Sequence, residues 1–374
     1  MKIAVNTRLL LKDKMEGIGW FTFETLKRIT ASHPEIDFIF IFDRKPSQDF
    51  IFSENVQAVV AHPQSRHPIL WYLFFEFGVY RVLKKHKPDL FLSPDGWLSL
   101  RSNTPQLAVI HDLNFEKHPE FVPFLVRKYY LYFFPRFAKK ARRLTTVSEY
   151  SKRDIVNRYG VDKDKVDVVY NGVNDVFRVH NDSEIAAIRN QFTGGAPYFL
   201  FVGLIHHRKN LKNQLLAFLK FKLQHSIELK YVIVGEKFWW DNEIDEVLKN
   251  SEFRDDVIFL GRRGMDDLVA LYGGAFALTY ASFFEGFGIP IIEAFKSGVP
   301  VITSNTSSMP EVADKGAILV DPDSVSEIAA AMKMLVENDS KRESLIVFGK
   351  ERAKKFAWEN AAEGLWSSIQ KALS

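Results

Sequence analysis

Two glutamates eight residues apart flank a glycine-rich turn in the C-terminal half of the sequence. Glu285 precedes the turn and Glu293 follows it, one turn inside a predicted helix that begins near Pro290. The turn consists of Gly286, Phe287, Gly288 and Ile289. Glycine lets the backbone approach a ligand closely, and the free N–H groups at a helix start attract an anion such as phosphate.

A carboxylate beside a phosphate is repelled by it. Two carboxylates at a phosphate site are therefore expected to bind hydroxyl groups of the same ligand, such as those of ribose and a sugar. The spacing predicts a nucleotide-sugar site. An ordinary strand-loop-helix connection with two solvated glutamates is the alternative, and it would be preferred for a lone Gly-x-Gly.

A pair of adjacent cations follows another predicted strand, Tyr198–Val202. After this strand Gly203 leaves room for a ligand. Arg208 and Lys209 could neutralise a diphosphate without a metal ion, because the guanidinium offers paired N–H donors and the ammonium a compact positive charge. A solvated basic turn is the alternative and would be preferred if this segment stood alone.

In the N-terminal half, His111 and Asp112 stand just past the predicted strand Leu107–Ile110. An isolated histidine is more often bonded to a backbone carbonyl than engaged in chemistry. Its place at a strand end, with an aspartate next to it, favours a functional role. Near the N-terminus, Gly17 and Gly19 open a predicted helix, and the lack of the third glycine of the dinucleotide fingerprint counts against an NAD enzyme.

Strand-like and helix-like segments alternate along the chain, which predicts an α/β fold with parallel sheets covered by helices. Two sets of six strands imply two Rossmann-like domains. The expected strands are Lys2–Val5, Phe38–Phe42, Val56–Val60, Leu90–Leu92, Leu107–Ile110, Arg143–Val147, Tyr198–Val202, Tyr231–Val234, Val257–Leu260, Ala275–Tyr280, Val299–Thr303 and Ala317–Val320.

Residues 1–175 are expected to form the first domain and residues 190–357 the second, with a polar linker between them that extends to Gly195. Ligands of such sheets bind beyond the carboxyl ends of the strands. The two sheets are therefore expected to face each other across a cleft that holds the ligand.

The motifs together resemble the donor-site signature of the retaining glycosyltransferases of family 4, which have the GT-B fold, and the resemblance covers nearly the whole chain. Details around Gly17-Ile-Gly19 look most like bacterial mannosyltransferases of surface polysaccharide assembly. Many members place an arginine directly after the glycine that is Gly203 here, where this chain has Leu204. That role is therefore assigned to Arg208.

The resemblance implies a role for each motif. Gly17, Gly19 and Gly203 would let the backbone approach the donor, with Arg208 and Lys209 on its diphosphate. Glu285 would bind the donor sugar, Glu293 the ribose and His111 the reacting centre. Asp112 would lie on the acceptor side, and the C-terminal helix 358–374 would pack on the first domain.

The function expected from the resemblance is retaining, metal-independent transfer of a sugar, with mannose from GDP-mannose as the leading guess. The acceptor would be a saccharide or a lipid-linked molecule, and no cofactor is expected. A nucleotide-sugar epimerase or hydrolase of the same fold is the first alternative. A non-catalytic binding subunit is the second.

The composition limits the possible classes of protein. The 374 residues contain no cysteine, carry a net charge of +4, and are 47% hydrophobic and 26% charged, as expected of a soluble protein of two domains. Without cysteine there is no disulfide scaffold, thiolate zinc site or cysteine nucleophile. The mild basicity falls short of a nucleic-acid binder. The first residues show no signal pattern and no long apolar run occurs, so a cytoplasmic enzyme is expected.

Residues 121–143 could bind an anionic membrane surface, because they combine aromatic residues with basic ones and contain no acid. The basic residues are Arg127, Lys128, Arg136, Lys139, Lys140, Arg142 and Arg143. A helix packed on its sheet with a solvated basic edge is an equally good interpretation. Pro135 is expected to break any single long helix here.

Overall fold

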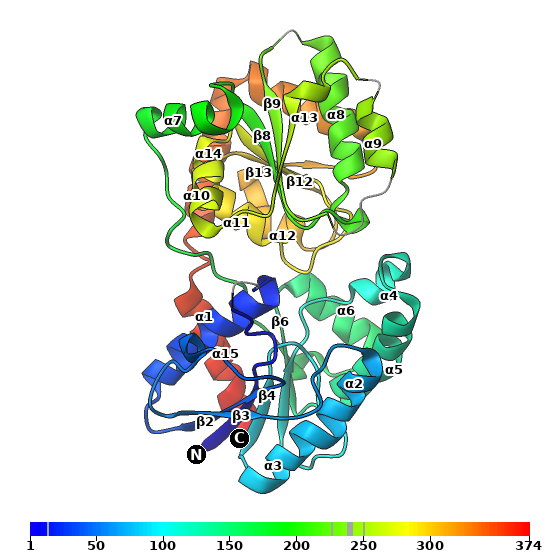
Figure 1. The fold of residues 1–374 in the computed structure, drawn as a ribbon, viewed down its shortest axis with the longest axis vertical. Helices are drawn as coiled ribbons and strands as arrows, with labels where there is room; N and C mark the ends of the chain where they lie inside the picture. Colours follow the sequence, from blue (N-terminus) through cyan, green and yellow to red (C-terminus); the bar gives the residue numbers. More distant parts are fainter. Residues whose placement is uncertain (13–14, 226, 238–241, 250) are drawn as a thin grey trace. The chain divides into compact units, whose positions relative to one another are not determined.

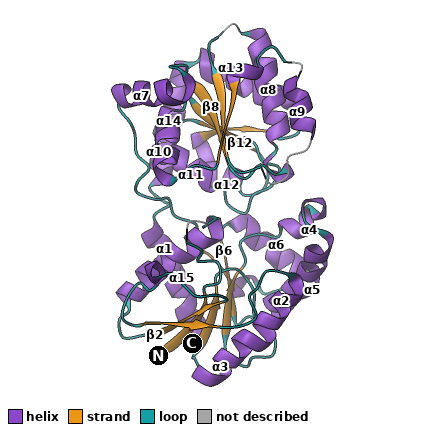
Figure 2. Cartoon of the chain, in the orientation of Figure 1, coloured by secondary structure: helices purple, strands orange, loops and turns teal. Residues whose placement is uncertain are grey.

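The computed structural model describes residues 1–12, 15–225, 227–237, 242–249 and 251–374. It contains two compact units. The first comprises Met1–Gly172 together with Trp358–Ser374, and the second comprises Val173–Ala357. Each unit is a parallel sheet with helices on its faces (Figures 1 and 2). The predicted α/β class with two Rossmann-like domains is confirmed.

The sheet of the first unit has the order β3-β2-β1-β4-β5-β6-β7. Its strands are β1 (Lys2–Asn6), β2 (Asp37–Phe42), β3 (Val56–Val60), β4 (Leu90–Ser93), β5 (Gln106–Val109), β6 (Arg143–Thr146) and β7 (Val166–Val168). The central strands β4 and β5 are buried throughout, because helices cover both faces of the sheet. The strand order reverses between β1 and β4, where the connecting loops diverge and leave room for a ligand.

This sheet has seven strands, so the prediction of six is wrong. The missing strand, β7, is three residues long, lies at the edge and carries Asp167 at its centre, so it has no apolar run to reveal it. Tertiary contacts hold it in place. Asp167 pairs with Arg143 of β6 and accepts hydrogen bonds from Ser368 and Lys371, both at 2.9 Å.

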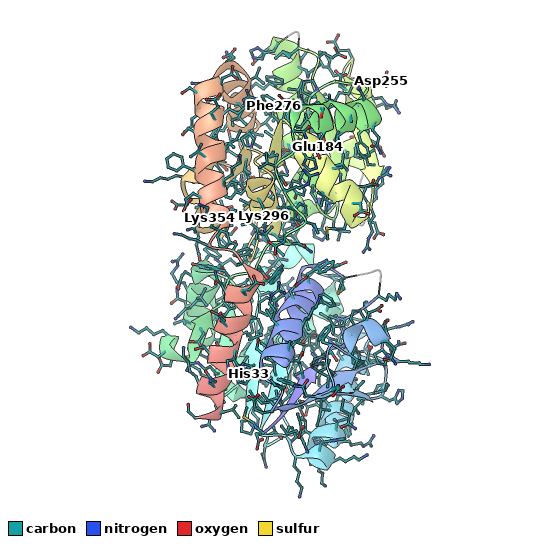
Figure 3. The ribbon with its side chains drawn as sticks, turned by 90° about the vertical axis from the view of Figure 1, so that its left-hand side faces the viewer. His33, Glu184, Asp255, Phe276, Lys296 and Lys354 are labelled. Carbon is teal, nitrogen blue, oxygen red and sulfur yellow. The ribbon has the colours of Figure 1, made fainter. Side chains whose placement is uncertain are left out.

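The helices of the first unit are α1 (Gly17–Ser32), α2 (Pro68–Leu73), α3 (Tyr80–His86), α4 (Asn114–Lys117), α5 (Phe124–Lys140), α6 (Glu149–Tyr159) and α15 (Trp358–Leu373). The last of these returns from the end of the chain to lie beside α1 (Figure 1). His33, just after α1, stacks on Trp366 of α15 with 3.8 Å between ring centroids (Figure 3). A Cβ atom on Gly172 would come within 2.6 Å of the Trp358 backbone, so glycine permits this close passage.

Pro135 does not break α5, contrary to the sequence-based expectation, and the helix runs from Phe124 to Lys140. Proline removes one hydrogen bond from a helix interior. Here the buried aromatic side chains of Tyr129, Phe134 and Phe137 hold both halves of the helix against the core. Packing therefore outweighs the local defect.

The sheet of the second unit has the order β10-β9-β8-β11-β12-β13. Its strands are β8 (Tyr198–Val202), β9 (Lys230–Val234), β10 (Val257–Gly261), β11 (Ala277–Tyr280), β12 (Val301–Ser304) and β13 (Ala317–Val320). The helices are α7 (Asp182–Thr193), α8 (Leu211–Gln224), α9 (Asn242–Lys249), α10 (Met265–Gly274), α11 (Ile289–Lys296), α12 (Met309–Ala313), α13 (Val325–Glu337) and α14 (Asp339–Ala353). Among the described residues, no helix is both long and apolar enough to cross a membrane.

The polar stretch that the sequence assigns to a linker contains a helix, α7, which belongs to the second unit. Asn181 and Glu184 form a reciprocal capping box at its start, and Gly194 ends it in a left-handed conformation. Only Ile188 and Thr193 of this helix are buried, so most of its surface is exposed or partly exposed. Its polar surface explains why it resembles a linker.

Candidate functional site

Three glycines stand at the carboxyl ends of neighbouring strands in the second unit. Gly203 follows β8, Gly235 follows β9 and Gly261 ends β10, and all three have positive φ, at 151°, 157° and 69°. A Cβ atom on Gly235 would lie only 1.9 Å from the Gly203 carbonyl oxygen. The two loops therefore approach each other in a way that only glycine allows, and they leave backbone free of side chains at this edge.

Arg208 and Lys209 lie in a short helical turn between β8 and α8. The imidazole of His206 accepts a hydrogen bond from the Arg208 N–H at 3.1 Å and begins the turn. Asn210 ends it in a left-handed conformation, and its side chain donates to the carbonyls of Ala281 and Pro322 at 2.9 and 2.7 Å. The turn is thus tied to the loop that follows β11.

Both cations contact the same carboxylate. Arg208 Nη1 lies 2.6 Å from Glu285 Oε2, and Lys209 Nζ lies 2.7 Å from Glu285 Oε1. Lys209 Nζ also donates to the Tyr280 hydroxyl at 2.6 Å. Glu285 is 6% exposed and Lys209 9%, so these charges are largely removed from water. We call Arg208, Lys209, Glu285 and Tyr280 the ion cluster.

The loop that carries Glu285 is held from several sides. The Glu285 N–H donates to Ser307 Oγ at 3.1 Å, and Ser308 Oγ is 2.9 Å from the Glu285 carbonyl and 3.0 Å from that of Phe287. Gly288 then begins α11 with φ at 109°. The glycine-rich turn is therefore positioned before any ligand binds, as an anion site requires.

Glu293 occupies a different environment from Glu285. Its carboxylate accepts a hydrogen bond from the buried Tyr272 hydroxyl at 2.7 Å. No ion pair to Glu293 occurs among the residues that the structure describes. The two glutamates that the sequence pairs by spacing thus have separate partners.

Their environments drive the two pKa values apart. Burial by itself would raise the pKa of Glu285, but the charges of Arg208 and Lys209 outweigh it and lower the pKa to about 2. Burial raises the pKa of Glu293 to about 7, and the hydrogen bond from Tyr272 opposes this only in part. At neutral pH Glu285 is ionised and Glu293 is close to half protonated.

The first unit carries the other predicted residues at the carboxyl end of its own sheet. His111 follows β5, and its Nε2 lies 2.8 Å from the Pro94 carbonyl. A carbonyl only accepts, so Nε2 carries the proton and Nδ1 keeps a lone pair. Burial lowers the pKa of His111, so the imidazole is neutral. Asp112 accepts from the Asn114 N–H at 2.9 Å through one oxygen.

Gly17 and Gly19 lie at the start of α1, where the sequence places them. A Cβ atom on Gly19 would be 3.1 Å from the Leu9 carbonyl oxygen. The predicted residues thus form two groups. One, with His111, Asp112, Gly17 and Gly19, belongs to the first unit, and the other, with the ion cluster and Glu293, belongs to the second.

Two sequence models of known families match the chain. Glycosyltransferase Family 4 matches residues 15–177, and Glycosyl transferases group 1 matches residues 182–352. Each match falls almost wholly within one of the two units. The chain is a glycosyltransferase with a family 4 domain followed by a group 1 domain.

Individual relatives agree with this assignment. The transferase is 26% identical over 372 residues to the O-antigen chain mannosyltransferase B of Escherichia coli, covering 96% of this chain and 97% of that protein. It is 29% identical over 327 residues to the O-antigen chain mannosyltransferase RfbU of Salmonella typhimurium, covering 85% and 87%. The solved Anabaena HepE, in complex with UDP and glucose, superposes with a TM-score of 0.76 at 17% identity over 99% of both chains. The fold of the transferase is GT-B.

Several residues of the transferase site escaped the sequence analysis. Tyr280 contacts Lys209, Tyr272 contacts Glu293, and Gly235 packs on Gly203. Gly235 could have been found, because it follows its strand just as Gly203 does. Neither tyrosine carries a local signal, since each lies in an apolar element and shows its role only through a distant partner.

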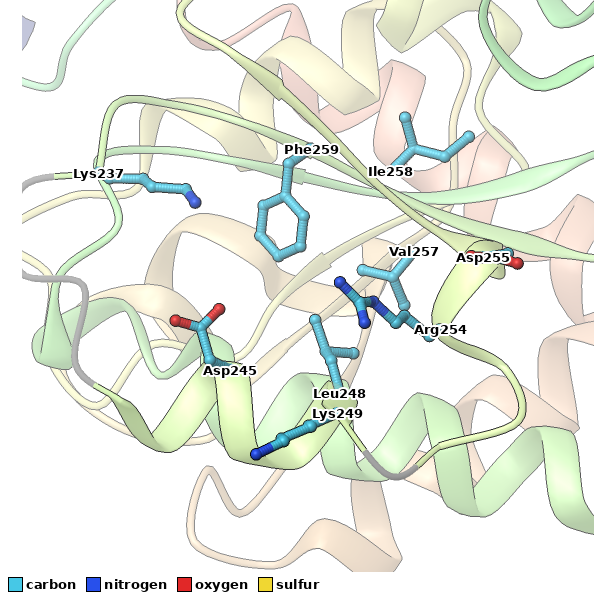
Figure 4. A pocket seen from close by; sticks show the side chains of 9 residues that line it. All are labelled: Lys237, Asp245, Leu248, Lys249, Arg254, Asp255, Val257, Ile258 and Phe259. Atoms are coloured by element: carbon cyan, nitrogen blue, oxygen red, sulfur yellow. The ribbon is translucent and has the colours of Figure 1, made fainter.

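A cavity of about 660 Å³ lies elsewhere in the second unit of the transferase, beside the edge strand β10 (Figure 4). It is lined by Lys237, Asp245, Leu248, Lys249, Arg254, Asp255, Val257, Ile258 and Phe259. Side chains of both signs surround the ring of Phe259. No predicted site residue lines this cavity, so the ion cluster and not the cavity defines the candidate site.

The two glutamates should respond oppositely to neutralisation. Glu293 has a raised pKa in the folded protein, so its contribution to stability is present below about pH 4.5 and is lost as the pH rises through 7. Glu293→Gln should therefore raise the free energy of unfolding at pH 8 by roughly 1–3 kcal/mol and have less effect at pH 5. Glu285→Gln should lower the free energy of unfolding by roughly 2–4 kcal/mol, because the buried Lys209 and the partly buried Arg208 lose their partner.

Chemical denaturation of both variants and the unaltered protein at pH 5 and pH 8 measures these differences. If Glu293→Gln lowers the free energy of unfolding at pH 8, compared with the unaltered protein at the same pH, the assigned pKa is contradicted.

Proposed function

We propose that this glycosyltransferase transfers mannose from a nucleoside diphosphate mannose, with GDP-mannose as the first candidate donor. The acceptor is a saccharide or a lipid-linked saccharide of surface polysaccharide synthesis. Full-length similarity to an O-antigen mannosyltransferase supports the choice of sugar and process. The likeness to HepE supports only the fold, because the two sequences are 17% identical.

The ion cluster is the observation that carries the donor assignment. Two adjacent cations share one carboxylate, at 2.6 and 2.7 Å, so one positive charge is left unbalanced within this group while the donor is absent. A diphosphate brings more negative charge than one carboxylate, and it offers several oxygens to the Arg208 fork. It can therefore take both cations from Glu285.

Once released, Glu285 is an ionised acceptor for the hydroxyl groups of the donor sugar. Arg208 and Lys209 then face the leaving diphosphate, where negative charge grows as the sugar departs. Charges already in position stabilise that change without further reorganisation. Glu293 in its ionised form is assigned to the ribose hydroxyls.

Metal independence and retention of configuration are part of the same proposal. The two cations supply the charge that a divalent metal would otherwise supply to the diphosphate. If the acceptor approaches the face from which the diphosphate leaves, a leaving phosphate oxygen can accept the acceptor's proton, and the configuration is retained. His111 is assigned to the reacting centre, with Nδ1 as the acceptor of a hydrogen bond.

One set of assays tests the donor, the stereochemistry and the metal requirement. GDP should raise the melting temperature of the protein more than UDP or ADP, since a ligand that binds the folded state stabilises it. GDP-mannose and a manno-oligosaccharide should give an α-linked product by NMR, and a chelator should leave the rate unchanged. Loss of activity with the chelator and recovery with Mg²⁺ would contradict metal independence.

Mannose release or isomerisation without any acceptor, at the rate seen with acceptor, would instead favour a hydrolase or an epimerase.

Removal of the Lys209 charge tests the role of the ion cluster. Lys209→Ala should lower kcat about 100- to 1000-fold, as the loss of other preorganised charges in active sites does. Circular dichroism should be unchanged, and Lys220→Ala, which removes a surface lysine of α8, serves as the matched control. Near-normal turnover of the Lys209 variant would defeat the assignment.

We also propose that residues 121–143 bind a membrane surface, and exposed apolar residues of α5 support this proposal. Phe124, Leu125 and Tyr132 are 67%, 60% and 53% exposed, and basic side chains neighbour them. Tyr129 and Phe134, by contrast, are buried in the core. The exposed residues at the start of the helix are therefore the ones assigned to the lipid surface, on the cytoplasmic face of the membrane.

Vesicles with anionic lipids should bind the protein at low salt and release it at high salt. Replacement of Phe124 and Leu125 by serine should weaken binding about tenfold, because two apolar side chains no longer enter the lipid. Leu223→Ser, which alters an exposed leucine of α8, is the control. No sedimentation of the unaltered protein with such vesicles would end the membrane proposal.

A further inference from the structure

Arg8 is a buried cation that the proposed reaction does not yet use. It follows β1, at the point where the strand order of the first sheet reverses, and it is 7% exposed. Its Nε donates to Asp95 Oδ2 at 2.6 Å. Its guanidinium lies 5.2 Å from the centroid of the Phe75 ring and 4.6 Å from that of Trp97. One carboxylate and two aromatic rings thus fix its orientation.

The carboxylate of Asp95 is itself held by three donors. Asn6 Nδ2 donates to it at 2.7 Å, Ser93 Oγ at 3.0 Å and the Trp97 N–H at 3.4 Å. Asp95 therefore has no freedom to follow a ligand. Its contribution is to hold Arg8, which makes it a positioning residue.

The outer nitrogens of Arg8 have unused capacity. Neither Nη atom has a hydrogen-bond partner among the described residues, although only 8% of the side chain is exposed. Neither belongs to the fully buried polar atoms that lack a partner, so both reach the surface. A guanidinium that is nine-tenths buried and fixed in orientation thus presents its outer N–H donors at the surface, where a ligand can accept from them.

Two neighbouring groups also have hydrogen-bonding capacity to spare. Asp112 uses one carboxylate oxygen on Asn114, and within the described part of the chain its other oxygen has no partner. The Tyr130 hydroxyl likewise has none there. Burial raises the pKa of Tyr130 to about 12 while the charge of Arg8 opposes this, and Asp95 and Asp112 add to it. Tyr130 and Arg8 also contact the same ring, since the Tyr130 centroid lies 5.5 Å from that of Trp97 and the Arg8 guanidinium lies 4.6 Å from it. The phenol stays protonated and remains a donor.

The charge of this group selects the kind of ligand. Arg8 contributes one positive charge, Asp95 and Asp112 contribute two negative charges, and His111 is neutral. A net negative charge disfavours a phosphate or diphosphate. Donors on Arg8 and Tyr130 beside an acceptor on Asp112 suit a neutral ligand whose hydroxyl groups both donate and accept.

We propose that Arg8, Tyr130 and Asp112 form an acceptor subsite for a neutral sugar residue, with Asp95 holding Arg8 in position. The inference rests on the proposed function and narrows its acceptor to one recognised by sugar hydroxyls at this point, not by a phosphate. Its new residues are Arg8 and Tyr130, which lie outside the family motifs, whereas Asp112 is the acceptor-side residue that the resemblance already implies.

Two conservative variants test the subsite in the full-length protein. Arg8→Lys keeps the charge beside Asp95 but removes the outer nitrogens, and Tyr130→Phe removes a single hydroxyl. Each should raise the KM for a short manno-oligosaccharide about tenfold, as expected for the loss of one hydrogen bond to a bound ligand. The KM for the donor, and kcat at saturating acceptor, should stay within twofold of normal. Tyr80→Phe removes a hydroxyl elsewhere in the same unit and is the control.

Saturation-transfer NMR with α-mannobiose and, separately, with inorganic phosphate measures binding without turnover. Binding of the disaccharide that weakens about tenfold in both variants would support the inference. Unchanged disaccharide affinity in both variants, or binding of phosphate alone, would overturn it.

These outcomes are separable from those of the proposed reaction. If the disaccharide binds as expected but no donor supports transfer of mannose, the proposed donor and sugar fail while the subsite stands. If mannose is transferred normally and the acceptor KM is the same in all variants, the subsite alone fails.

Discussion

The ion pairs of Arg208 and Lys209 with one carboxylate are the interaction on which the site in the second unit depends. Both cations are largely buried, and their mutual repulsion in that environment would be costly without an anion. In the ligand-free protein Glu285 supplies it. The serines beneath the glycine-rich turn, the left-handed Asn210 and the close pair Gly203 and Gly235 all serve to bring these three charges to one edge of the sheet.

Nearby charges also explain why the two glutamates of this site have different pKa values. Glu285 lies between cations and remains ionised, whereas Glu293 lies against Tyr272 without a cation and has a pKa near 7. Identical side chains thus have different protonation states because their surroundings differ. The proposed donor has both a diphosphate and many hydroxyls, and carboxylates of both kinds would suit it.

The first unit also has a cation paired with a carboxylate at the carboxyl end of its sheet, but its net charge has the opposite sign. Arg8 is paired with Asp95 and enclosed by aromatic rings, and the surplus charge there is negative. A cationic edge in one unit and a weakly anionic edge in the other suit an anionic donor and a neutral acceptor. Both edges lie at the carboxyl ends of parallel strands, where loops are free to carry such groups.

Much of the architecture was readable from local pattern. Strand-like runs of three to six residues predicted twelve of the strands, and the spacing of Glu285, Glu293, Arg208 and Lys209 indicated a nucleotide-sugar site. Local pattern failed where packing decides: the short strand β7 depends on Asp167, α7 is too polar to be recognised, and Pro135 is tolerated because aromatic residues hold α5.

The sequence by itself determined which residue types stand at the strand ends, because strand and helix periodicities and glycine turns are encoded by near neighbours. Only the tertiary structure decided their partners. Arg208 meets Glu285 across 77 residues, Lys209 meets Tyr280 across 71 and Arg8 meets Asp95 across 87. The physical reason is that parallel sheets place distant strand ends side by side, so the cations that lower the pKa of Glu285 come from a segment that no local pattern identifies.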